Sequence, residues 1–111
     1  MTDCLFCKIA NGEIPANLVH EDDQVVVFHD IAPKADVHLL VIPRIHIESL
    51  ESVQVEHDEL MGHIMRLLPV LAKQHGLEDG FRTIINTGKG GGQVIFHLHV
   101  HLMGGPALPG F

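Results

Sequence analysis

Hydrophobic and polar positions follow two different periods along the chain, and the change of period separates strands from a helix. Four segments rich in β-branched or aromatic residues are bounded by turn residues, and a fifth alternates between apolar and polar positions. They predict about five strands. Their sequences are LVHED (18–22), QVVVFHD (24–30), HLLVIP (38–43), FRTIIN (81–86) and VIFHLHVHLM (94–103).

Between Val53 and His75 the apolar residues recur every three or four positions, which predicts the main helix. Its buried stripe is expected to be Leu60, Ile64, Leu67, Leu68 and Leu71. Pro69 has no N–H for the carbonyl four residues back, so a kink or an unpaired carbonyl is expected there. A shorter helix near residues 4 to 11 would end at Gly12.

The order of these elements is helix, three strands, helix and two strands, without the regular alternation of a parallel sheet. We therefore expect an α+β fold, in which an antiparallel sheet of about five strands carries one long and one short helix. No internal repeat or low-complexity linker interrupts the sequence, so residues 1–111 are expected to form a single domain.

Composition and charge narrow the classes of function. No apolar run approaches the roughly 20 residues that span a bilayer, and the N-terminal residues lack the basic start and apolar stretch of a secretion signal. The net charge is −7, and no cluster of Lys and Arg is present to follow a phosphate backbone. We expect a cytoplasmic protein that binds neither membranes nor nucleic acid polymers.

Three alternating histidines are the main chemical feature of the sequence. On a strand, His97, His99 and His101 would share one face, and the residues between and after them would face the core. At about 3.3 Å per residue the outer two are roughly 13 Å apart, too far for all three to bind one tetrahedral zinc. Solvated surface residues are the alternative, but three in register favour a histidine nucleophile with helpers.

The loop GKGGGQ (88–93) lies between two predicted strands, beside the histidines. Its bare backbone could point several N–H groups at an anion, although it could equally be a mobile hairpin. It is not a Walker A sequence, which needs Ser or Thr after Gly-Lys. Next to a histidine nucleophile it favours attack on phosphorus, because that reaction needs donors around the oxygens that gain charge.

Two segments together resemble the histidine-triad (HIT) family. HLHVHLM (97–103) matches its pattern of alternating histidines, and FHDIAPKADVHLLVIPRIH (28–46) resembles its second signature. The ending MGGPALPGF is similar to the Hint branch, the histidine-triad nucleotide-binding proteins. The matches run from Cys4 to Gly105, and the resemblance implies the HIT fold, a homodimer and a purine nucleotide as substrate.

By this resemblance the protein would hydrolyse purine nucleoside phosphoramidates or acyl-adenylates at the α-phosphorus. His99 would attack and carry the nucleotide covalently until water releases the monophosphate. His101 would contact the phosphate and assist the leaving group, and His38 would help fix the protonation of the triad. His97 completes this catalytic group.

The resemblance also assigns substrate-binding positions. Asn86 would hydrogen-bond near the leaving group, the Gly92 N–H would bind the phosphate, and Asp30 would accept from the ribose hydroxyls. Residues lining the base pocket would be Leu5, Phe6, Ile9, Phe28 and Ile31. Val94 departs from the pattern, because many relatives have a Ser or Thr hydroxyl there that donates to the phosphate. Losing such a bond costs about 1.5–3 kcal/mol, so slower turnover is expected.

Cys4 and Cys7 form a Cys-x-x-Cys pair, and with His46 and His97 they resemble the zinc ligands of many bacterial relatives. Two thiolates and two imidazoles suit a structural tetrahedral zinc that ties the N-terminal segment to the sheet, which would make His97 structural. Catalysis itself would need no cofactor. A reduced cysteine pair without metal is the alternative, whereas no βαβ pattern supports a redox pair.

Three other functions stay open at this point. The protein could hydrolyse or phosphorolyse dinucleoside polyphosphates, which substrate panels would separate. It could be a nucleotide-binding scaffold with vestigial chemistry, which Val94 favours. It could also be a zinc hydrolase with His97 and His99 as metal ligands.

Overall fold

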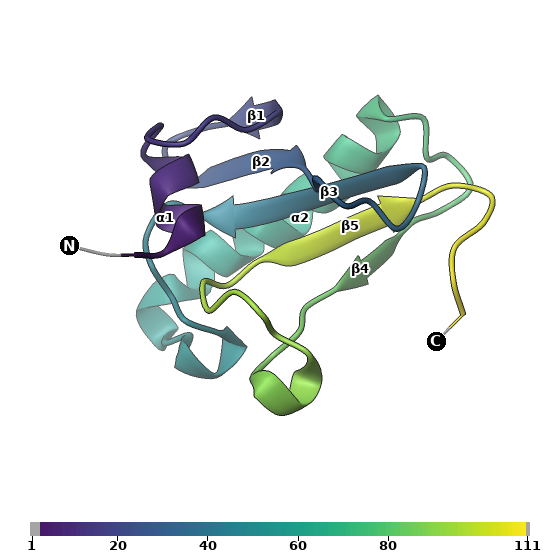
Figure 1. Cartoon of the computed structure of the whole chain (residues 1–111). Coiled ribbons are helices and arrows are strands. Elements are labelled where there is room, and N and C mark those ends of the chain that lie inside the picture. The colour runs from purple at the N-terminus through teal and green to yellow at the C-terminus, as the bar shows by residue number, and fades with distance from the viewer. Residues whose placement is uncertain (1–2, 111) are drawn as a thin grey trace.

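The computed structural model describes residues 3–110 and has the predicted α+β architecture (Figure 1). The helices are α1 (Leu5–Ala10) and α2 (Asp58–Gln74), and the strands are β1 (Leu18–Glu21), β2 (Val25–His29), β3 (Val37–Pro43), β4 (Arg82–Ile84) and β5 (Val100–Gly104). The five strands form one sheet in the order β1-β2-β3-β5-β4, and every neighbouring pair is antiparallel. The expected fold class and order of elements are confirmed.

The sheet separates two layers of apolar side chains. The long helix α2 covers one face, and the short helix α1 covers part of the other (Figure 1). Successive side chains of a strand point to opposite faces, so Leu39 and Val41 pack with α2 while Leu40 and Ile42 pack with α1. Because α1 has only one and a half turns, the rest of its face of the sheet is left open for a site.

The main helix begins five residues later than predicted. Its expected apolar stripe is buried, but a short 3-10 turn at Val55–His57 stands where the helix was expected to begin, after another such turn at Leu50–Ser52. The Gln54 N–H donates to His57 Nδ1, which holds the chain in that turn, and acidic Asp58 then starts the helix where its dipole favours negative charge. The helix continues through Pro69, which lies on its exposed side where water can reach the unpaired carbonyl.

The predicted strand from Val94 to Met103 is also too long, because β5 begins only at Val100. The register pairs Val41 with Val100, so continuing the ladder by two positions would place Pro43 opposite Leu98. Proline has no N–H to donate, and the Leu98 N–H instead donates to the Ile47 carbonyl at 2.7 Å. His97 and His99 therefore lie before the strand, although Leu98, Val100 and Leu102 are fully buried as expected.

No helix within residues 3–110 has the length and apolar character required to cross a bilayer.

Replacing Ile64 by alanine tests the packing of α2 on the sheet. Ile64 is fully buried in the layer between them, so the cavity should lower the free energy of unfolding by about 2–5 kcal/mol. Urea unfolding measures the change, with the exposed β-branched Val55→Ala as the matched control. Equal effects of the two substitutions would contradict this packing.

Candidate functional site

A pocket of about 500 Å³ opens beside α1 on the sheet face opposite α2. All the residues expected to bind the nucleotide line it, together with three of the four expected catalytic histidines. The first group is Leu5, Phe6, Ile9, Phe28, Asp30, Ile31, Asn86, Gly92 and Val94, and the second is His38, His99 and His101. His97 is fully buried and does not line this pocket.

The wall of the pocket nearest α1 is aromatic. The Phe6 ring meets the Phe28 ring edge-on at 5.5 Å and the His99 ring at 5.1 Å. Two apolar residues at the mouth are exposed, Ile31 at 99% and Val94 at 86%. A flat apolar group could therefore lie between α1 and the sheet, close to His99.

The hydrogen bonds of His99 leave one ring nitrogen free to react. Its Nδ1 lies 2.8 Å from the His97 carbonyl oxygen, which can only accept, so Nδ1 carries the proton. The neutral ring then has its lone pair on Nε2. Since only 8% of His99 is exposed and the residue lines the pocket, Nε2 is a shielded candidate nucleophile.

A second chain of hydrogen bonds fixes the protons of His38 and His101. The backbone N–H of Lys34 donates to His38 Nδ1 at 3.0 Å, so a neutral His38 must carry its proton on Nε2. His38 Nε2 lies 2.9 Å from His101 Nδ1 and donates to it. His101 in turn carries its proton on Nε2, and the residue lines the pocket, where an N–H can donate to an anionic oxygen.

Burial keeps both of these rings neutral. It lowers the pKa of His38, with the positive charge of Lys34 acting in the same direction and Asp30 opposing them. It lowers the pKa of His101 to about 4, with His99 and His38 adding to the effect. The proton positions derived above therefore hold near pH 7.

The two polar residues of the pocket are also held by the backbone. Asp30 accepts from the Ala32 N–H at 2.8 Å through Oδ1, while its Oδ2 lies 3.4 Å from His38 Nε2. Asn86 donates from Nδ2 to the Gly91 carbonyl at 2.9 Å. Each side chain thus holds its own loop and also lines the pocket.

The glycine loop has a defined shape and is not an open hairpin. A 3-10 turn occupies Lys89–Gly91, and Gly92 follows with a φ of 87°, which favours glycine. The buried side chain of Gln93 accepts from the Gly88 N–H at 2.9 Å and donates to the Glu48 carbonyl at 2.7 Å. Gln93, which the sequence did not single out, closes the loop and ties it to the chain after β3.

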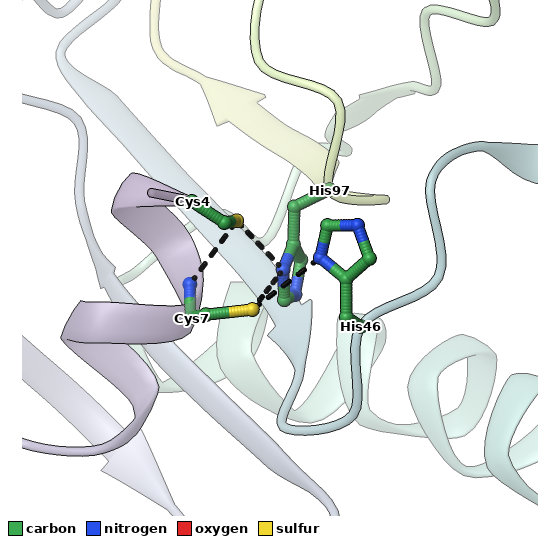
Figure 2. A group of neighbouring side chains, drawn as sticks. All are labelled: Cys4, Cys7, His46 and His97. Atoms are coloured by element: carbon green, nitrogen blue, oxygen red, sulfur yellow. Dashed lines mark hydrogen bonds between the residues drawn. The ribbon is translucent and has the colours of Figure 1, made fainter. Parts of the chain in front are cut away.

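Cys4, Cys7, His46 and His97 converge beside the first turn of α1 (Figure 2). Cys4 Sγ lies 3.3 Å from His97 Nδ1, and Cys7 Sγ lies 3.3 Å from His46 Nδ1 and 3.5 Å from His97 Nδ1. Zinc bonds of about 2.0–2.3 Å at tetrahedral angles place ligand atoms roughly 3.3–3.8 Å apart, so the four residues fit this metal. His97 Nε2 donates to the Pro43 carbonyl at 2.8 Å, which leaves Nδ1 as its metal-facing nitrogen.

The Cys7 thiol is protonated when no metal holds it. Burial, together with the hydrogen bond and charge of Cys4, raises the pKa of Cys7 to about 11. A zinc ion would displace this proton, because it binds cysteine as the thiolate.

Asp30, His38 and His101 form a second cluster of metal-ligand type within the pocket. This cluster suits a metal poorly, because both ring nitrogens of His38 are already used. The Lys34 N–H occupies the lone pair of Nδ1, which requires the proton to stay on Nε2. A metal ion there would have to remove that proton, so the cysteine cluster is the better metal site.

Comparison with known proteins agrees with this geometry. The profile of the domain described as scavenger mRNA decapping enzyme C-term binding matches residues 3–109. A crystal structure of a HIT family hydrolase from Legionella pneumophila Philadelphia 1 superimposes with a TM-score of 0.92 and 46% identity, over 95% of each chain. The chain belongs to the HIT family. It is a nucleotide-binding hydrolase of that family, as the resemblance of its two signature segments implied.

Two relatives of this HIT protein bear on its chemistry. The purine nucleoside phosphoramidase of Escherichia coli K12 is 42% identical over 96% of this chain and 90% of its own. A 14 kDa zinc-binding protein of Zea mays is 44% identical over 91% of this chain and 80% of its own. The name of the first relative is consistent with a nucleotide pocket, and the name of the second is consistent with a zinc site at the cysteine cluster.

The sequence missed five residues that line the pocket: Lys34, Leu40, Ile84, Ile95 and Met103. Two of them could have been found, because Leu40 and Met103 lie two positions after His38 and His101 and share their face of the sheet. Ile84 lies at the pocket because it pairs with His101 across β4 and β5, and Lys34 and Ile95 reach the pocket from loops. Local periodicity carries no signal for these last three.

Replacing Gln93 by alanine should loosen the glycine loop. The change leaves the Gly88 N–H and the Glu48 carbonyl without their partner, at a cost of about 1–3 kcal/mol. Amide hydrogen exchange over residues 88–93 should accelerate, and urea unfolding should show the lower stability. The exposed Gln74→Ala on α2 is the control, and unchanged exchange in the loop would show that Gln93 does not hold it.

Proposed function

We propose that this HIT protein hydrolyses purine nucleoside phosphoramidates, and also acyl-adenylates, at the α-phosphorus. The observation that carries the proposal is the free Nε2 of His99 inside a pocket with an aromatic wall. The 42% identical phosphoramidase supports the choice of substrate. Attack through Nε2 forms a bond to phosphorus and breaks the bond to the leaving amine or carboxylate.

The second half of the reaction restores the enzyme. Water attacks the same phosphorus, the bond to His99 breaks, and the nucleoside monophosphate leaves with the oxygen of that water. In the proposed complex the Nε2–H of His101 donates to a phosphate oxygen or to the leaving group, and the Gly92 N–H donates to the phosphate. Asp30 accepts from the ribose hydroxyls, and Asn86 lies near the leaving group.

We further infer that Cys4, Cys7, His46 and His97 hold a structural zinc. The metal, when bound, supplies four bonds that tie α1 to the end of the sheet, and α1 forms the aromatic wall of the pocket. His97 is then structural in its side chain, while its carbonyl still orients His99. Catalysis by His99 does not pass through this metal.

Val94 supports one second candidate, a nucleotide-binding scaffold with weak activity. Its exposed side chain at the pocket mouth has no donor for a phosphate, so the reaction would depend on the backbone N–H groups and on His101. A zinc hydrolase is disfavoured, since His97 Nδ1 faces the cysteines while His99 faces the pocket. Dinucleoside polyphosphate cleavage, the homodimer and the cytoplasmic location stay predictions.

The proposed mechanism makes His99 indispensable for turnover. His99→Ala should lower the rate of adenosine phosphoramidate hydrolysis by about 1,000-fold or more, because it removes the nucleophile, while AMP binding survives. Rapid-quench mass spectrometry of the wild type should show one nucleoside monophosphate on the peptide that carries His99. The control is His63→Ala on α2, across the sheet from the pocket, and equal turnover in His99→Ala and the wild type would remove His99 as nucleophile.

The zinc assignment is tested by metal analysis. The purified protein should contain about one zinc per chain, and Cys7→Ser should lose most of it because a hydroxyl is a poor zinc ligand. Asp30→Asn is the matched control, since it alters the second cluster and should keep the zinc. Full zinc content in Cys7→Ser, or zinc lost only in Asp30→Asn, would place the metal elsewhere.

A further inference from the structure

Lys34 is the one Lys or Arg that lines the pocket in the described part of the chain. It lies in the loop that joins β2 to β3, between Asp30 and His38. Its backbone N–H donates to His38 Nδ1, which fixes where the loop passes the histidines. The side chain itself is exposed and reaches the pocket from the rim.

The ammonium group of Lys34 has no carboxylate partner within 4.0 Å among residues 3–110. The nearest candidate in sequence, Asp30, is directed to the Ala32 N–H and to His38. Arg44, by contrast, is used structurally, because it donates to the Ala10 carbonyl and to Glu21. Lys34 thus presents to the pocket a positive charge that no ion pair holds.

That charge matters because little else in the pocket is positive. The whole chain has a net charge of −7, and His38 and His101 are neutral near pH 7 because their pKa values are lowered. The positive charge of Lys34 contributes to both of these shifts, so its ammonium lies within electrostatic reach of both rings. An anionic substrate entering this pocket has Lys34 as its cationic partner.

We propose that Lys34 is a specificity residue that binds an anionic oxygen group of the substrate through its ammonium. This inference rests on the proposed function and deepens it, because it selects substrates by charge. The anionic oxygens can belong to the α-phosphate or to a carboxylate on the leaving group. The ammonium contacts substrate and leaves the covalent chemistry to His99.

Lys34→Ala removes the charge but keeps the backbone N–H, so the same hydrogen bonds still set the tautomers of His38 and His101, and burial remains the main cause of their lowered pKa values. If Lys34 binds the α-phosphate, AMP binding measured by calorimetry should weaken by roughly 3- to 10-fold, a modest effect because an exposed charge is screened by water. Binding of uncharged adenosine should not change. Lys34→Arg should restore AMP binding, and the charge-matched Lys73→Ala on the exposed side of α2 should behave as the wild type.

Two substrates separate the sources of the anionic group. If Lys34 binds the α-phosphate, Lys34→Ala weakens AMP binding. It also raises KM equally for the adenosine phosphoramidates of glycine and of a neutral amine, with kcat little changed. If it binds the leaving group, KM rises for the glycine compound alone and AMP binding stays the same. Either result supports the proposal, and Lys34→Ala with wild-type values for all three compounds overturns it.

The proposed chemistry can fail separately. If the wild type binds AMP and Lys34→Ala binds it more weakly, but neither protein hydrolyses a phosphoramidate, the proposed hydrolysis is overturned and the role of Lys34 in binding is kept. A wild type that does not bind AMP and hydrolyses neither compound would overturn both.

Discussion

The point where the ladder between β3 and β5 ends determines where the alternating histidines go. Pro43 has no N–H to donate to the neighbouring strand, so the segment before Val100 leaves the sheet. The Pro43 carbonyl then accepts a hydrogen bond from His97 Nε2, which orients Nδ1 of that ring towards the cysteines. Because Pro43 lacks an N–H, His97 joins the cysteine cluster while His99 and His101 line the pocket.

Proton positions follow from this division. The His97 carbonyl holds the proton of His99 on Nδ1, and the Lys34 N–H sets the tautomers of His38 and His101 one after the other. Backbone groups, which do not titrate, therefore decide which nitrogen can attack, which can donate and which can bind metal. Burial keeps the rings of His38 and His101 neutral, so these assignments persist near pH 7.

Burial patterns made much of the fold predictable from sequence. The stripe of α2 and the buried positions Leu98, Val100 and Leu102 follow from fixed periods of helix and strand. The predicted first residues of α2 and β5 were wrong, since these starts depend on particular bonds, such as that from the Leu98 N–H to the Ile47 carbonyl, that no local period encodes. The histidines and cysteines of the site came from short motifs, whereas Gln93 and Lys34 act through partners set by tertiary structure.

Position 34 places two tasks on separate atoms of one residue. The tautomers of the histidines depend on its peptide N–H, which every amino acid except proline supplies, while the charge presented to the pocket depends on its side chain. A side-chain substitution at this position can therefore change the charge presented to the pocket while the same backbone hydrogen bond keeps the tautomers of His38 and His101. The preference for charged substrates can in this way change without rebuilding the catalytic histidines.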